Sequence, residues 1–120
     1  MKDWNSYIID QRSICEKYGA NWISLDPELR IGIADNTFKG VMPINGLRHP
    51  QEKNTSGWYV WAGDGYSEDK DFFKPICIKH LHELYPDILK YLGLPPGYRF
   101  QIDENGYEDV WEDQTLLFEE

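Results

Sequence analysis

The fold is decided by residues 45–73, which read NGLRHPQEKNTSGWYVWAGDGYSEDKDFF. The centre of this stretch, residues 57–61, has the aromatic and β-branched composition that is typical of a strand. Side chains of a strand point alternately to its two faces. Every second side chain counted from Trp58 would therefore lie on one face, and every second side chain counted from Tyr59 on the other. Both sets are large and apolar. The pattern therefore predicts a strand that is covered on both faces, or covered on one face and binding a partner with the other.

The flanks of this strand differ in character. Residues 45–57 contain Asn45-Gly46, His49-Pro50 and Ser56-Gly57, a density of turn formers that predicts one long loop. Loops of about a dozen residues are often functional. On the other side, residues 64–71 form an acidic exit from the strand.

The N-terminal part of the chain predicts a helix followed by short strands. Residues 3–18 carry a rough apolar stripe at the helical period, and Gly19 is a suitable stop. Residues 22–25 and 29–34 read as strands. Residues 38–44 are the expected hairpin partner of 29–34.

The C-terminal part predicts two helices and a hairpin. A helix is expected from about residue 75, with a proline in its first turn, and a second short helix over 87–92. Residues 98–102 and 107–111 flank Asn105-Gly106, a strong signal for a hairpin turn. The predicted fold class is α+β, with a mostly antiparallel sheet packed against an N-terminal helix and a central helical pair, in one domain over residues 1–120.

Composition narrows the class of partner. The chain has 120 residues, 41% hydrophobic and 15% aromatic, with a formal net charge of −9. This charge argues against nucleic acid and against an anionic membrane surface as partners, and favours a basic one. The sequence shows neither a signal peptide nor an apolar run of the roughly 20 residues that a membrane span needs, and its two cysteines are typical of a reducing compartment. We therefore expect a cytoplasmic protein.

The histidines and cysteines do not form a recognisable chemical motif. Cys77 and His80 would share one face of a helix, but no further metal ligand follows at a known spacing. The Pro-Ile-Cys-Ile surroundings of Cys77 are those of a buried thiol rather than an activated nucleophile. The sequence predicts no catalytic residue, no metal and no cofactor.

Two clusters of acidic and aromatic residues are better candidates for function. Residues 64–71 hold four carboxylates against one lysine, and residues 103–120 hold eight with no lysine or arginine. Interleaved aromatic side chains give such a surface anchors as well as charge, although a solvated acidic face is the alternative. The predicted partner-binding residues are Trp61, Asp64, Tyr66, Glu68, Asp69, Asp71, Tyr107, Glu108, Asp109, Trp111 and Glu112.

Several segments resemble the bacterial immunity protein 33 family, over roughly residues 29–117. They are NGLRHP at 45–50, TSGWYVWAGD at 55–64, SEDKDFF at 67–73, PDILKYLGLPPGYRF at 86–100 and YEDVW at 107–111. The first contributes a motif loop of Gly46, Leu47, Arg48, His49 and Pro50. The chain departs from the family at Asp64-Gly65, where a second acidic residue would be usual.

The resemblance implies an immunity protein encoded beside a polymorphic toxin. Such a protein is a cytoplasmic, non-enzymatic inhibitor that binds and blocks a secreted toxin domain, and the charge of this chain predicts a basic one. One alternative is a small hydrolase or ligand-binding domain that uses His49, Arg48 and nearby carboxylates, for which a deep pocket would be required. A scaffold domain with a large exposed apolar patch is another.

Overall fold

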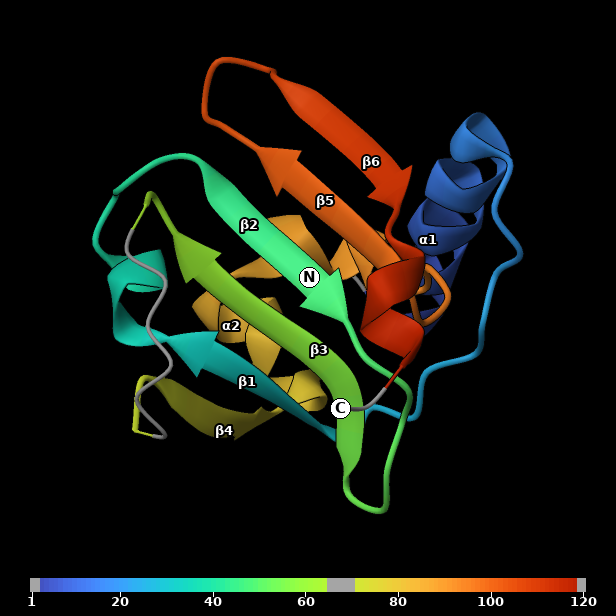
Figure 1. The fold of residues 1–120 in the computed structure, drawn as a ribbon, viewed down its shortest axis with the longest axis horizontal. Helices are drawn as coiled ribbons and strands as arrows, with labels where there is room; N and C mark the ends of the chain where they lie inside the picture. The colour runs from blue at the N-terminus through green and yellow to red at the C-terminus, as the bar shows by residue number, and fades with distance from the viewer. Residues whose placement is uncertain (1–2, 65–70, 119–120) are drawn as a thin grey trace.

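A six-stranded sheet with its α-helices on one face forms the body of the structure (Figure 1). The computed structural model describes residues 3–64 and 71–118. In chain order the elements are α1 (Trp4–Tyr18), β1 (Arg30–Ala34), the 3-10 helix η1 (Asp35–Phe38), β2 (Ile44–Arg48), β3 (Thr55–Ala62), β4 (Phe73–Cys77), η2 (Ile78–His80), α2 (Leu81–Leu84), η3 (Pro86–Tyr91), β5 (Tyr98–Ile102), β6 (Glu108–Glu112) and η4 (Gln114–Leu117).

The strand order is β4-β1-β3-β2-β5-β6. Strands β1 and β3 run parallel, and every other neighbouring pair is antiparallel. The predicted α+β class, with a mostly antiparallel sheet, an N-terminal helix and a short helical pair, is therefore confirmed. The aromatic strand of the sequence is β3, which lies inside the sheet between β1 and β2.

The larger core lies between the sheet and the helices. Trp58 and Val60 of β3 are fully buried there, and the Trp58 indole N–H donates to the Leu92 carbonyl at 3.0 Å. Asp3 caps the N-terminus of helix α1, and its carboxylate accepts the Ser6 amide at 3.0 Å. The helix packs its buried face against η3. These contacts cover one face of the sheet with a continuous layer of helix.

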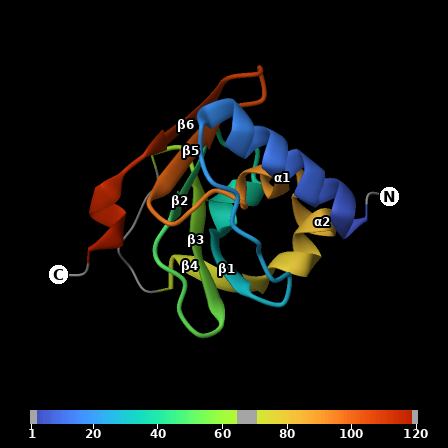
Figure 2. The same ribbon diagram turned by 90° about the vertical axis from the view of Figure 1, so that its right-hand side faces the viewer.

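A smaller core lies on the opposite face of the sheet. Ala34, Leu47, Trp61 and Leu116 are buried together, and Tyr59, Phe72 and Phe73 pack against them. Leu116 belongs to η4, which lies on this side of the sheet while α1 and α2 lie on the other side (Figure 2). The strand β3 is thus covered on both faces, which is the first of the two arrangements that its alternating aromatic residues predict.

The predicted loop over residues 45–57 is wrong, because its first third is the strand β2. Gly46 lies opposite Val60 and Phe100 in the sheet, and a Cβ atom there would come within 2.1 Å of the Phe100 ring. The Asn45 side chain accepts the Gln101 amide at 2.8 Å. Asn45-Gly46 is therefore used for close packing across strands rather than for a turn.

Three other local predictions are also wrong. Residues 22–25 form no strand, and β1 pairs with β3 and β4 rather than with residues 38–44. The helix expected from residue 75 begins only at 78, because residues 73–77 form the edge strand β4. Pro75 is tolerated there because an edge strand leaves one side of its backbone unpaired.

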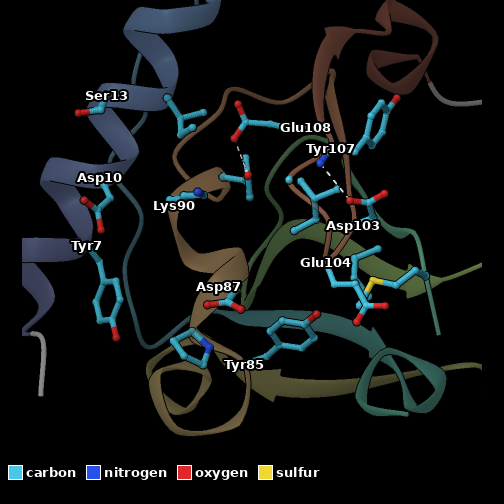
Figure 3. Close-up of a pocket in the computed structure, with 17 residues that line it drawn as sticks. Tyr7, Asp10, Ser13, Tyr85, Asp87, Lys90, Asp103, Glu104, Tyr107 and Glu108 are labelled. Atoms are coloured by element: carbon cyan, nitrogen blue, oxygen red, sulfur yellow. Dashed lines mark hydrogen bonds between the residues drawn. The ribbon is translucent and has the colours of Figure 1, made fainter. Parts of the chain in front are cut away.

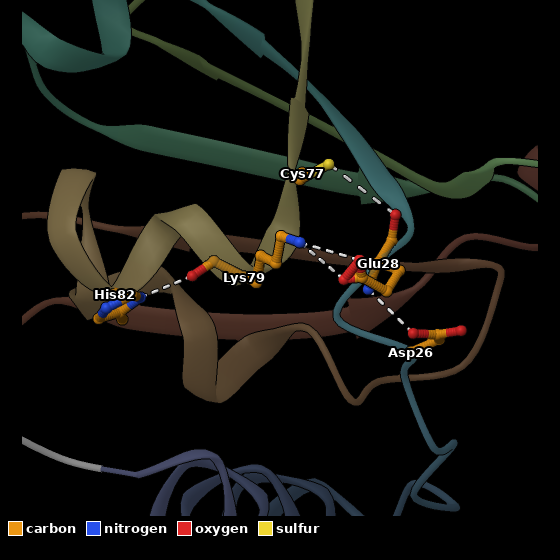
Figure 4. Close-up of polar contacts among 5 residues, drawn as sticks. All are labelled: Asp26, Glu28, Cys77, Lys79 and His82. Atoms are coloured by element: carbon orange, nitrogen blue, oxygen red, sulfur yellow. Dashed lines mark hydrogen bonds and ion pairs between the residues drawn. The ribbon is translucent and has the colours of Figure 1, made fainter.

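Contacts of the loop before β1 hold it against η2 (Figure 4). The Lys79 ammonium lies 2.8 Å and 2.9 Å from the two Glu28 carboxylate oxygens, and the Glu28 amide donates to Asp26 at 2.9 Å. His82 Nδ1 lies 2.6 Å from the Lys79 carbonyl. The ion pair is exposed, so it orients the loop more than it stabilises the fold.

Candidate functional site

A groove of about 860 Å³ opens on the helical side of the sheet. Its walls are α1, η3 and the hairpin between β5 and β6 (Figure 3). Tyr7, Asp10 and Ser13 line it from α1, whereas Asp103, Glu104 and Tyr107 line it from the hairpin. The groove is shaped by three segments that are far apart in the sequence.

The floor of the groove is apolar. It consists of side chains that are buried or nearly so, among them Ile14, Ile44, Ile102 and Tyr91, with Met42 beside them. These residues belong to the main core, so the floor is a rigid surface of the folded domain rather than a mobile loop. An apolar side chain of a partner would find van der Waals contacts here.

The rim of the groove is acidic. Its lining contains five carboxylates, from Asp10, Asp87, Asp103, Glu104 and Glu108, and the single lysine Lys90. Asp87 and Glu104 are exposed, and neither forms an ion pair with any residue in 3–64 or 71–118. Asp103 is engaged in the hairpin turn, where its carboxylate accepts the Asn105 and Tyr107 amides at 2.8 Å and 3.0 Å.

The charges of Asp87 and Glu104 converge on one tyrosine. Burial raises the pKa of the Tyr85 hydroxyl, and the carboxylates of Asp87 and Glu104 raise it further. A raised pKa for a phenol is expected where the local potential is negative, because ionisation would add another negative charge. The contributions of Asp87 and Glu104 to this shift therefore indicate a negative potential in this part of the groove.

Glu108 closes one end of the groove and ties its walls together. Its carboxylate accepts hydrogen bonds from Lys17 Nζ at 2.6 Å, the Tyr18 hydroxyl at 2.7 Å and the Tyr91 hydroxyl at 2.6 Å. Burial alone would raise the pKa of Glu108, but the hydrogen bonds from Lys17, Tyr91 and Tyr18 lower it to about 2. The carboxylate is thus charged at neutral pH and links α1, η3 and β6.

The alternation of β6 divides the predicted C-terminal cluster between the two faces of the sheet. Glu108 and Glu112 lie opposite Ile102 and Tyr98 on the helical side. Asp109 and Trp111 lie on the other face, opposite Gln101 and Arg99. Residues that are adjacent in the sequence therefore serve two different surfaces.

The remaining predicted contact residues lie at one end of the sheet or outside the described residues. Asp64 follows β3 and Asp71 precedes β4, and both are exposed at the end where the β5–β6 hairpin turns and Tyr107 is 46% exposed (Figure 1). Trp61 is only 8% exposed and belongs to the smaller core, where its ring lies edge-on to that of Phe73. The predicted contacts Tyr66, Glu68 and Asp69 lie outside the described residues.

Comparison with known proteins places the chain in a family. The model of the Imm33-like domain matches residues 10–113. The chain belongs to the Imm33-like family. The match confirms the resemblance of the sequence motifs, and it begins inside α1 rather than at residue 29. Searches of curated proteins and of solved structures gave no match.

The motif loop of this Imm33-like domain straddles the end of a strand. Gly46, Leu47 and Arg48 belong to β2 and are buried, whereas His49 and Pro50 follow it and are exposed. A loop over all five residues was expected, so this prediction is corrected. The first three residues of the motif are part of the sheet because each of them pairs with a residue of β3.

Arg48 is a buried structural residue of the Imm33-like domain. Its Nε donates to the Ser56 carbonyl at 2.9 Å and its Nη1 to the Leu94 carbonyl at 2.7 Å, while its side chain lies over Trp58. Burial lowers the pKa of the guanidinium to about 10. Because Arg48 has no exposed surface, it cannot contact a substrate in solvent. The hydrolase or ligand-binding alternative, which uses Arg48 together with His49, therefore lacks the accessible arginine that it requires.

The cysteines of the Imm33-like domain are free thiols with backbone neighbours. Cys15 is buried, its Sγ lies 3.5 Å from the Gly93 carbonyl, and burial raises its pKa. Cys77 ends β4, with its Sγ 3.9 Å from the Glu28 carbonyl (Figure 4). Among residues 3–64 and 71–118, no three His, Cys, Asp or Glu side chains are grouped to hold a metal ion.

Sequence reasoning missed the part of the groove contributed by the helices. Tyr7 and Asp10 come from α1, and Tyr85, Asp87 and Lys90 from the segment around η3. Residues three apart share one face of a helix, so the pairing of Tyr7 with Asp10 and of Asp87 with Lys90 was visible in the sequence. That the two pairs flank one groove depends on how α1 packs against η3.

Within the described part of the chain, no helix combines the length and the apolar character that crossing a membrane demands.

Proposed function

We propose that this Imm33-like domain is a cytoplasmic immunity protein that binds a cognate, basic toxin domain and blocks it by occlusion. The observation that carries the proposal is the family membership over residues 10–113. The domain acts by binding rather than by catalysis, because an immunity protein needs only to cover the functional surface of its toxin.

The charge of the protein supports a basic protein partner. The net charge is −9, and the described surface includes a groove with five carboxylates and one lysine in its lining. Opposite charges steer two proteins toward each other and accelerate association. A polyanionic partner, such as a nucleic acid or an anionic membrane, would be repelled by the same surface.

Aromatic residues supply the anchors that charge alone lacks. Tyr107 and Trp111 are 46% and 39% exposed, on the hairpin and on the edge strand β6. Tyrosine and tryptophan are enriched among the residues that dominate the energies of protein interfaces. Charged groups would then govern the rate of encounter, and aromatic groups the lifetime of the complex.

The test is co-expression with the toxin domain encoded by the adjacent gene. We expect cells that produce both proteins to survive and the purified proteins to form a complex. Its association rate should fall as NaCl rises from roughly 50 to roughly 500 mM, because the Debye length shrinks from about 14 Å to about 4 Å over this range. The proposal fails if no complex forms, or if the complex leaves the toxin fully active.

A further inference from the structure

We infer that the groove between α1, η3 and the β5–β6 hairpin holds an arginine-bearing segment of the toxin domain. The inference deepens the proposed function and rests on it for the identity of the partner. It assigns the contact to one surface and the recognition chemistry to a guanidinium group with an apolar neighbour.

The choice of occupant follows from the contrast between floor and rim. Ile44, Ile102 and Met42 offer apolar contact at the bottom. Asp87 and Glu104 stand at the rim, where they form no ion pair within residues 3–64 and 71–118. A segment with one apolar side chain between two cationic side chains would contact the apolar floor and pair with the acidic rim at the same time.

The tyrosines of the groove favour arginine over lysine. Tyr85 is half-buried and Tyr107 is exposed, and both line the groove beside carboxylates. A guanidinium can stack on a phenol ring and at the same time donate two parallel hydrogen bonds to a carboxylate. An ammonium group makes the ion pair but lacks the planar donor geometry and is more strongly hydrated.

The groove is preformed rather than assembled on binding. Glu108 joins the three walls through Lys17, Tyr18 and Tyr91, with each donor within 2.7 Å of the carboxylate. Tyr91 in turn stacks on Phe100 with ring centroids 4.7 Å apart. A rigid site spends little free energy on ordering itself, so more of the contact energy appears as affinity.

The other face of the sheet is a poorer match for a cation. The segment η4 already covers part of it, with Leu116 in the same buried cluster as Leu47 and Trp61. Arg99 lies on that face and pairs with Asp113 at 2.7 Å, which adds positive charge and neutralises a carboxylate. Charge complementarity therefore selects the groove.

The first arm of the test compares two charge-reversed variants of the full chain, Asp87→Lys/Glu104→Lys and Glu16→Lys/Glu52→Lys. Both change the net charge equally, and Glu16 and Glu52 are exposed residues outside the groove. Circular dichroism and the unfolding midpoint confirm that each is folded. Binding to the toxin domain encoded by the adjacent gene should weaken roughly thirtyfold for the groove variant and no more than roughly threefold for the control.

The second arm needs no toxin. A short synthetic peptide with two arginines flanking a leucine is titrated into the ¹⁵N-labelled protein, beside the same peptide with citrulline, a neutral isostere, in place of arginine. We expect the arginine peptide to shift the backbone amides of residues 85, 87–90 and 103–108, and the citrulline peptide to bind at least roughly tenfold more weakly.

The two arms separate failure of the inference from failure of the proposed function. If the toxin domain binds wild type and groove variant equally, the groove inference is overturned while the proposed function stands. If wild type does not bind the toxin domain, the proposed function fails and the peptide decides: shifts confined to the groove support a site for basic segments, and shifts elsewhere or none overturn it.

Discussion

The substitution Glu108→Gln should show that the hydrogen bonds of the Glu108 carboxylate to Lys17, Tyr18 and Tyr91 are a major source of stability. The change keeps the shape of the side chain and removes its charge. A fall in the carboxyl pKa from an ordinary 4.5 to about 2 corresponds to about 3 kcal/mol, at 1.36 kcal/mol per pH unit. The Glu108 side chain is 16% exposed and its partner Lys17 is 61% exposed, so solvent screening reduces this value. We expect a loss of about 2 kcal/mol at pH 7.

The pH dependence gives the sharper signature. The pKa of Glu108 is lowered in the folded protein, so the stabilisation is fully present above pH 4.5 and is lost as the pH falls toward about 2. The stability difference between wild type and Glu108→Gln should therefore be constant from pH 7 to about 5.5 and shrink below that. Guanidinium unfolding followed by tryptophan fluorescence at pH 7, 5.5, 4 and 3 would measure it.

Glu112→Gln is the matched control for this experiment. Glu112 lies four residues further along β6, is exposed and undergoes the same change in charge. We expect its substitution to change the free energy of unfolding by less than about 0.5 kcal/mol. The reasoning is refuted if both variants lose the same stability, or if the loss in Glu108→Gln stays unchanged between pH 7 and pH 3.

Four further substitutions, one of them a control, test the packing of the sheet by the same unfolding measurement. Gly57→Ala should lower the free energy of unfolding by about 3 kcal/mol or more, because the φ of Gly57 is 88° and the new Cβ would lie 2.0 Å from a backbone oxygen. Gly106→Ala should lower it by only about 1 kcal/mol, because Gly106 has a similar φ of 92° but open space around it. Equal losses in the two variants would contradict this reasoning. Gly46→Ala should cost about 2 kcal/mol or more because its Cβ would overlap the Phe100 ring, and an unchanged midpoint would show that the ring moves aside freely. Arg48→Met should cost about 2 kcal/mol or more because two buried carbonyls lose their donors, and a more stable variant would show that burying the guanidinium costs more than its hydrogen bonds return.

The sequence predicted those elements whose determinants are local. The helix over 3–18 with Gly19 at its end matches α1, and the turn at Asn105-Gly106 matches the β5–β6 hairpin. The alternation around Trp58 correctly placed successive side chains of β3 in two cores. Caps, tight turns and the two faces of a strand depend on residues within a few positions, which is why a single sequence reveals them.

The dipeptide Asn-Gly shows where local reasoning stops. It occurs at 45–46 and again at 105–106, and the sequence predicts a turn at both. Gly106 turns the chain with a φ of 92°, whereas Gly46 lies within β2 and makes room for Phe100. The difference is decided by a ring far along the chain, so no pattern within residues 45–57 could have revealed it.

The same limit explains why the groove was only half visible. The sequence identified its hairpin wall through the acidic run that contains Tyr107 and Glu108, but Asp10 and Asp87 join that wall only because α1 and η3 pack side by side. Folding also separates residues that are adjacent in the sequence, because Glu108 and Asp109 point to opposite faces of β6.

A count of charges along the chain thus predicts that a basic partner binds. The surface that it binds depends on which carboxylates the fold leaves without a cation of the same chain. Lys17 neutralises Glu108, and Arg99 neutralises Asp113. Asp87 and Glu104 keep their charge exposed, and for that reason a partner's arginine would gain most by meeting them.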